Sequence, residues 1–223
     1  MLLWTIINST KRETKIERLE MKFIVPIQIL RAAIVSAGKD DVRHYLNGVH
    51  FTHNRVDSTN GHVAYLASGK SEIPSWFDSE FDKYDVIVKL LGKVPASTRQ
   101  KCIQYAVFES DGDNNRMLVR YMNLYGEQIH IGHGEVVDGK FPNIPKLLAS
   151  TRRSEKKLDD DIGFNSEYLA MPNQMLGKGL FNTVKFEMFS ENTAGIATLM
   201  RSGIVTGYKE SMLIMPVRLK KDS

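Results

Sequence analysis

Cysteine is nearly absent from the sequence, because Cys102 is the single one among 223 residues. One cysteine cannot form a disulfide within the chain, so we expect a protein of a reducing compartment. As a small apolar side chain, Cys102 itself is expected to be buried. Long apolar runs are missing too, and none approaches the roughly 20 residues of a membrane-spanning helix. Both absences predict a soluble, cytoplasmic protein with no membrane partner.

A strong excess of charge is also missing. The chain carries 30 Lys and Arg against 26 Asp and Glu, a formal net charge of +4, with an isoelectric point near 9.0. So mild a basic excess permits a nucleic-acid partner without requiring one. The apolar share of 42% and the charged share of 25% are ordinary for a folded domain.

Motifs for catalysis and metal binding are equally scarce. Residues 111–115 begin like a calcium loop, but Arg116 and Met122 occupy the positions that need glycine and a carboxylate. His130 and His133 are three residues apart on an expected strand, which points them to opposite faces, and no cluster completes a zinc set. No nucleophile elbow or dinucleotide loop is present. We therefore expect no enzyme, no metal site and no cofactor.

Apolar periodicity predicts the first elements. A helix is expected over 27–39, because Pro26 suits its start and Gly38 its end. Strands are expected over 55–59 and 62–68, around a turn at Asn60-Gly61. Asn47-Gly48 indicates either a hairpin turn or a bulge.

The later chain repeats this theme. Residues 86–94 predict a short helix or a strand that runs into one, and the charged stretch 146–161 predicts a linker or an exposed helix end. A strand followed by a helix is expected within 162–176. Further strands are expected over 104–110, 117–123, 127–136, 184–190, 196–202 and 211–219. Strand, helix and antiparallel strands thus recur three times, which predicts an α+β fold of repeated half-domains.

The first 20 residues differ from the rest, since a polar, charged stretch precedes the abrupt apolar pattern at Met21. We expect Met21 to be the true start and residues 1–20 to be an extension that is not native. A short helical extension is the alternative.

Five motifs resemble one family, in the right order along the chain. DVRHYLNGVHF (41–51) and STNGHVAYLA (58–67) resemble the middle domain of the bacterial DNA polymerase III beta subunit, the sliding clamp. VVDGKFPNIPKLL (136–148) is similar to the end of that domain. IGFNSEYL (162–169) and LIMPVRL (213–219) are similar to the second half of the family's last domain. The resemblance covers most of 21–219 and implies the DNA clamp fold.

The resemblance also implies a hydrophobic pocket that binds short peptides of polymerases and other replication proteins. In this role the Gly-His turn at Gly61 and His62 is not catalytic. Carried over residue by residue, the pocket consists of Leu46, Thr59, Gly61, His62, Ala64, Pro142, Lys146, Leu147, Leu213, Met215, Pro216, Val217 and Arg218.

For duplex DNA the resemblance implies contacts to phosphates without base reading. Arg43, His44 and Tyr45 match a DNA-contacting loop of the family, although His44 replaces an aromatic residue and Asp40 adds a negative charge nearby. The predicted helices add Arg31, Lys39, Lys89 and Lys93 as candidates to line a channel, with solvated helix faces as the alternative.

The chain departs from the family in size. It resembles a whole middle domain (21–150), a linker (151–158) and half of a last domain (159–223). A lone half-domain must be completed within the chain, by another copy or by a partner. The expected function is a compact sliding clamp of a phage or mobile element. Its expected partners are a polymerase, duplex DNA, a clamp loader and further copies of itself. The alternative is a peptide-binding module that does not encircle DNA and that competes for clamp partners.

Overall fold

The computed structural model describes residues 21–70, 72–78, 84–111, 115–155, 162–178, 181–202, 206–217 and 219. The predicted extension 1–20, the end of the predicted linker and Arg218 lie outside these described residues.

One antiparallel sheet of eleven strands runs through the described chain. In spatial order its strands are β1 (Lys22–Pro26), β6 (Tyr105–Ser110), β7 (Arg116–Met122), β8 (Gln128–Val136), β5 (Asp85–Leu90), β2 (Val49–Thr52), β3 (Arg55–Thr59), β4 (Val63–Gly69), β11 (Tyr208–Ile214), β10 (Gly195–Met200) and β9 (Thr183–Glu187). The expected mixture of helices and antiparallel strands is therefore confirmed.

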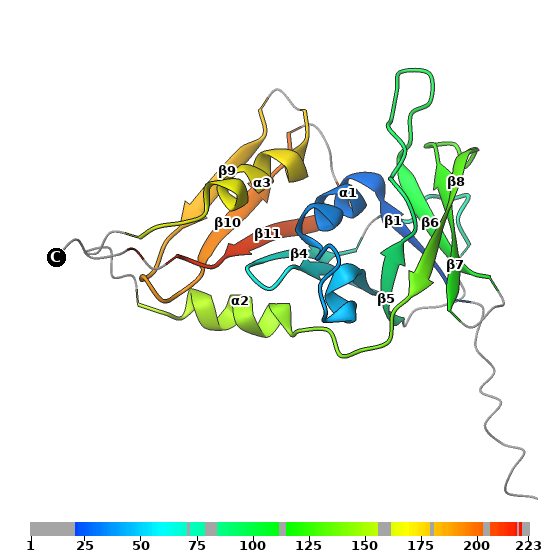
Figure 1. The fold of residues 1–223 in the computed structure, drawn as a ribbon. Coiled ribbons are helices and arrows are strands. Elements are labelled where there is room, and N and C mark those ends of the chain that lie inside the picture. The colour runs from blue at the N-terminus through cyan, green and yellow to red at the C-terminus, as the bar shows by residue number, and fades with distance from the viewer. Residues whose placement is uncertain are drawn as a thin grey trace, which may run out of the picture.

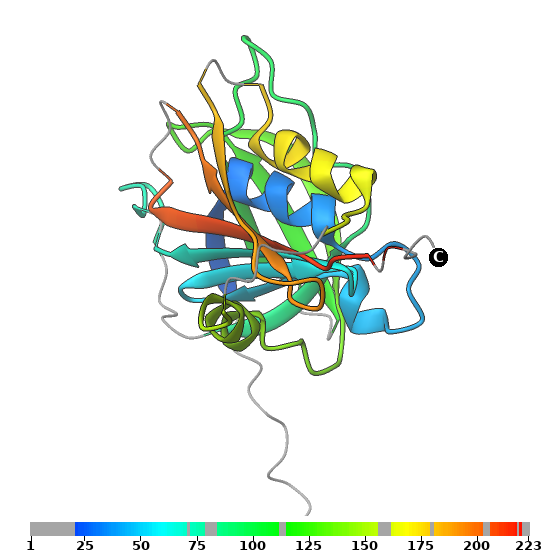
Figure 2. The ribbon, with the colours of Figure 1, turned by 90° about the vertical axis from the view of Figure 1, so that its left-hand side faces the viewer.

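The helices form two layers, one on each side of the sheet. Helices α1 (Ile27–Ser36) and α3 (Ser166–Leu176) lie against each other on one side, and α2 (Ile144–Arg152) lies on the other (Figures 1 and 2). We call these sides the α1/α3 face and the α2 face. The side chain of Asn143 caps α2, and that of Asn165 caps α3, by accepting a bond from a backbone N–H of the first turn.

Apart from α2, the strands and helices divide in chain order into three units. We call them the first, second and third halves, because each corresponds to one of the repeated half-domains. The first half consists of β1, α1, a short 3-10 helix η1 (His44–Asn47), β2, β3 and β4. The second consists of β5, β6, β7 and β8, and the third of α3, β9, β10 and β11.

The first half follows the sequence predictions closely. Helix α1 begins directly after Pro26, as expected. The turn at Asn60-Gly61 is confirmed, with Gly61 at φ 91°, a conformation that favours glycine. Asn47-Gly48 is neither a hairpin turn nor a bulge, because it joins η1 to β2, and the chain reverses at residues 53–54 instead.

The second half differs from its predicted pattern. Residues 86–94 do not form a helix: they contribute strand β5, and residues 91–104 continue without helix or strand. The β-branched run Val86–Val88 favours a strand, and Gly92 and Pro95 oppose a helix after it. The expectation that Lys89 and Lys93 lie on helices is therefore wrong. Cys102, expected to be buried, lies exposed in this loop.

The third half shares a buried core with the first half. Strand β11 pairs with β4 from Tyr208 opposite Gly69 to Ile214 opposite Val63, and α3 packs against α1. Residues from α1, β4, β10, β11 and α3 share one buried apolar cluster. On the α1/α3 face the third half is thus covered in part by the first half of the same chain.

Two strands end the sheet. Among the described residues β1 pairs with β6 alone, and β9 pairs with β10 alone. Phe186 on β9 and Met188 just after it are 42% and 39% exposed, so the β9 edge presents apolar surface.

Candidate functional site

The three predicted pocket segments meet where β4 adjoins β11. Leu213 lies directly opposite Ala64 in the strand register. Both belong to a buried cluster on the α2 face that includes Ile144 and Leu148 of α2. One residue beyond β11, the N–H of Met215 donates to the carbonyl oxygen of His62 at 2.9 Å.

The Gly-His turn is held rigidly by its own side chains. The hydroxyl of Thr59 donates to the carbonyl of Val63 at 2.7 Å and accepts from the N–H of Gly61 at 3.0 Å. Asn60 Oδ1 accepts from the N–H groups of His62 and Val63. The His62 ring is exposed, and its centroid lies 6.0 Å from that of Tyr168 on α3. This ring contact was not predicted, because no local pattern in the sequence pairs the two residues.

Apolar side chains of the predicted pocket remain accessible to solvent. Leu147 is 42% exposed, Met215 41% and Val217 42%, and Pro142 and Lys146 are also exposed at the start of α2. The N–H of Val217 donates to the carbonyl of Gly163 at 2.8 Å, which ties the C-terminal segment to the chain before α3.

Two further predicted pocket residues, Pro216 and Leu46, are less accessible. Pro216 is half-buried. Leu46 is buried within η1, and its carbonyl accepts from the N–H of Gly38 at 2.8 Å.

The loop predicted to contact DNA carries a neutralised charge. The guanidinium of Arg43 donates twice to Asp41, at 3.0 and 2.8 Å, and these bonds lower the pKa of Asp41 to about 2. A Cβ atom on Gly61 would come within 2.8 Å of the Arg43 guanidinium, so Arg43 lies beside the Gly-His turn. His44 is exposed, whereas Tyr45 is half-buried against Gly139.

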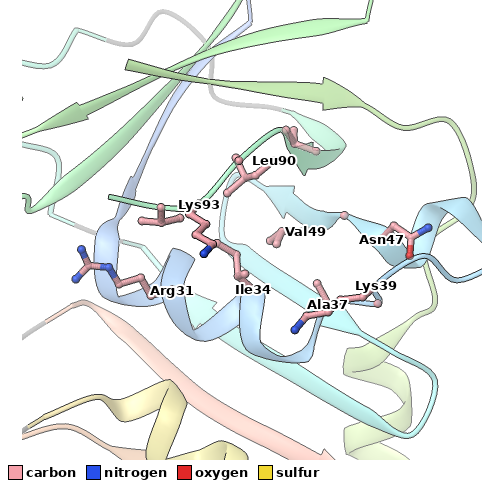
Figure 3. A pocket seen from close by; sticks show the side chains of 13 residues that line it. Arg31, Ile34, Ala37, Lys39, Asn47, Val49, Leu90 and Lys93 are labelled. Atoms are coloured by element: carbon pink, nitrogen blue, oxygen red, sulfur yellow. The ribbon is translucent and has the colours of Figure 1, made fainter. Parts of the chain in front are cut away.

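Three of the four cations predicted to line a channel surround one cleft of about 300 Å³ on the α1/α3 face. Arg31 of α1, Lys39 just after it and Lys93 of the loop after β5 belong to its lining (Figure 3). Lys89 does not, because it alternates on β5 with Val88 and Leu90, which do line the cleft.

An ion-pair network around the buried ring of His50, which reaches the exposed side chain of Asp85, escaped prediction. The two ring nitrogens of His50 lie 3.1 Å from a carboxylate oxygen of Asp57 and 2.7 Å from one of Asp85. Only an imidazolium can donate to both. Phe141, which precedes α2, stacks on the His50 ring at 4.8 Å. The three polar residues lie on different strands, and short motifs do not indicate such contacts.

Within the part of the chain that the structure describes, no group of three or more His, Cys, Asp or Glu side chains is arranged to hold a metal ion. No helix of the described residues has the length and apolar character to cross a bilayer.

Comparison with solved structures gives the fold class. Over 90% of its length the chain is similar to the H. pylori beta clamp in complex with diflunisal, with a TM-score of 0.57, 13% identity and 67% of that chain covered. It is similar, again over 90% of its length, to the beta chain of DNA polymerase III from Streptococcus pneumoniae TIGR4, with a TM-score of 0.53, 16% identity and 65% of that chain covered.

The chain therefore has the fold of the bacterial beta clamp, as its motifs predicted, and it spans about two thirds of the length of these clamp chains. No family model and no curated protein matches the sequence.

Proposed function

We propose that this protein is a DNA sliding clamp, a processivity factor that tethers a replicative polymerase to duplex DNA. It binds clamp-binding peptides in a hydrophobic pocket and catalyses no reaction. The main support is the junction of β4, β11 and α2, where three segments far apart in the sequence meet with their apolar side chains partly exposed.

The junction suits a short peptide. Leu147, Met215 and Val217 offer apolar surface that a few peptide side chains can bury. Methionine adapts its shape, which suits a site that accepts several related peptides. The exposed tips of His62 and Lys146 are available to orient the peptide.

Duplex DNA is proposed to lie against the α1/α3 face, where Arg31, Lys39 and Lys93 contact phosphates without reading bases. Lys89 projects from the other side of β5 and is therefore a weaker candidate. Arg43 is also weaker, because Asp41 already offsets its charge.

A clamp of this kind requires several copies in a closed ring. In the described part of the chain no strand pairs with the outer side of β1 or of β9, and these sides are available to extend the sheet from one copy to the next. A clamp loader is the expected partner for opening such a ring, and the cytoplasm is the expected location.

The alternative is a clamp-like module that binds the same peptides without encircling DNA and so competes for clamp partners. One observation favours it: the Arg43 charge in the predicted DNA loop is offset by Asp41.

Peptide binding tests what both candidates share. Met215→Asp and Leu147→Asp should each lower the affinity for a fluorescent clamp-binding peptide by more than tenfold, about 1.4 kcal/mol, because each places a charge in the apolar site. Leu124→Asp is the matched control, since Leu124 is 56% exposed in the distant turn between β7 and β8. Unchanged affinity in both folded pocket variants would refute the pocket.

Solution mass by light scattering, with and without circular duplex DNA, separates the two candidates. A multimer that is retained on circular DNA and lost after linearisation identifies a sliding clamp. A monomer that ignores DNA yet binds the peptide identifies the competing module.

A further inference from the structure

The cleft beside α1 lies at the position in the second half where the other two halves have a helix. In the first half a helix separates β1 from β2, and in the third half α3 precedes β9. In the second half residues 91–104 join β5 to β6 without a helix. Gly92, Lys93 and Val94 of this connection line the cleft together with residues of α1 and β2. The α1/α3 face therefore has an open slot alongside α1.

The floor of this slot is apolar. Ile34 of α1, Leu90 of β5 and Val94 line it and are half-buried, whereas Val49 of β2 and Val88 beneath them are already buried in the core (Figure 3). A DNA backbone contacts a protein through phosphates and sugars and would leave the half-buried apolar surface of Ile34, Leu90 and Val94 uncovered. A helix with an apolar stripe would bury it.

The rim of the slot is positively charged. Its lining includes the cations Arg31, Lys39 and Lys93 and no carboxylate. None of these three takes part in an ion pair with another described residue. An occupant that carries Asp or Glu beside its apolar stripe would complement this rim.

We propose that the cleft binds an acidic amphipathic helix of a partner protein, which takes the place of the helix that the second half lacks. Helix α1 has 10 residues, so a matching occupant is about 15 Å long. Apolar residues at i, i+3, i+4 and i+7 lie on the floor, and flanking carboxylates pair with Lys39 and Lys93. The occupant and duplex DNA then compete for the same cations.

A display library of helical peptides of three to four turns tests this proposal. The full-length protein serves as bait, and counter-selection against Lys39→Glu/Lys93→Glu removes peptides that bind elsewhere. We expect enriched peptides to have an apolar stripe flanked by Asp or Glu. Their affinity, measured by fluorescence anisotropy without DNA, should fall at least tenfold in the Lys39→Glu/Lys93→Glu protein and should weaken with added salt.

Lys185→Glu/Lys209→Glu is the matched control. It changes the net charge equally, and both lysines are exposed on strands where their neighbours, Val184 and Tyr208, pack against the buried cluster on the α1/α3 face. By strand alternation Lys185 and Lys209 therefore lie on the α2 face. The control should keep the affinity within about twofold.

The inference is overturned if no cleft-dependent peptide is enriched or if the enriched peptides carry basic or neutral flanks. It is also overturned if the control variant lowers their affinity as much as the cleft variant does. If Lys39→Glu/Lys93→Glu lowers the affinity for duplex DNA and leaves peptide affinity unchanged, the cleft binds DNA alone and the inference also fails. Because the peptide assay omits DNA, its outcome is separate from that of the clamp proposal.

Discussion

Replacing Glu210 of β11 should sharply destabilise the third half, and with it the contact that Tyr65 makes from the first half. Arg201 of the third half binds both carboxylate oxygens of Glu210, at 2.6 and 2.8 Å, and the two side chains are only 4% and 3% exposed. Tyr65 of β4 donates to the same carboxylate at 2.6 Å. Arg201 also donates to the carbonyls of Met175 and Leu176 at the end of α3.

The magnitude follows from the burial of the pair. Glu210→Gln keeps the size of the side chain but leaves the Arg201 charge without a counterion. Burial by itself lowers the pKa of Arg201, but in the native protein the bonds and charge of Glu210 more than offset this and raise it. Breaking a buried ion pair on one side costs about 3–5 kcal/mol of unfolding free energy, out of the roughly 5–15 kcal/mol typical of a folded domain.

Urea unfolding followed by circular dichroism measures this loss as a lower midpoint at an unchanged slope. Lys185→Ala is the control, because its ion pair with Glu187 is 3.9 Å long and Lys185 is 66% exposed, so it should cost less than about 1 kcal/mol. If Glu210→Gln costs no more than Lys185→Ala, the buried pair does not stabilise the third half.

Two further predictions concern the same sheet. Gly69 has φ 144° and a Cβ there would strike the carbonyl oxygen of Gly207, whereas Gly92 has φ 148° with open space around it. Gly69→Ala should therefore lower the unfolding free energy by at least about 1 kcal/mol more than Gly92→Ala. Equal losses in the two variants would contradict the packing of β4 against β11. Burial lowers the pKa of His50, but Asp57 and Asp85 outweigh it and raise the pKa above the usual ~6.5. The stabilisation that the protonated His50 ring provides is therefore complete below about pH 6.5 and is lost as the pH rises through the folded-state pKa of His50. The difference in thermal midpoint between the native protein and His50→Gln should thus shrink from pH 6 towards pH 8, about where histidine titrates, and a difference that grows over this range would refute the pairing.

Much of the fold was accessible from the sequence because its signals are local. Alternating apolar residues and the Asn60-Gly61 turn predicted the β3–β4 hairpin, which the register confirms. The clamp-like motifs predicted the fold class, and the three segments that they assign to a pocket meet at the β4–β11 junction. Their role in binding peptides stays a prediction.

The errors have local causes as well. Residues 86–94 are apolar enough for a short helix or a strand, and periodicity alone does not separate these two outcomes. Val86–Val88 favour the strand, and Gly92 and Pro95 end the run before a helix can begin. The missing helix opens the cleft that brings Arg31, Lys39 and Lys93 together.

Other contacts lie beyond any local pattern. His50 meets Asp85 and Phe141 across separations of 35 and 91 residues by sequence number, and no spacing rule relates residues so far apart. Likewise, Tyr168 stacks on His62 only because α3 docks on the first half. Such contacts follow from the assembled fold rather than from any one segment.

One strand pairing links stability to the proposed function. The β4–β11 ladder joins the third half to the first and also brings Met215 to His62 at the candidate pocket. A variant that loosens the ladder without touching the pocket should therefore weaken peptide binding in proportion to the population that undocks. Glu210→Gln is such a variant. Glu210 contacts Tyr65 and Arg201 on the α1/α3 side of β11, whereas the candidate pocket lies on the α2 side. Its peptide affinity should recover on cooling towards the temperature of maximum stability, whereas the affinity of Met215→Asp should stay low at every temperature. If both variants respond alike, the pocket is not built on this pairing.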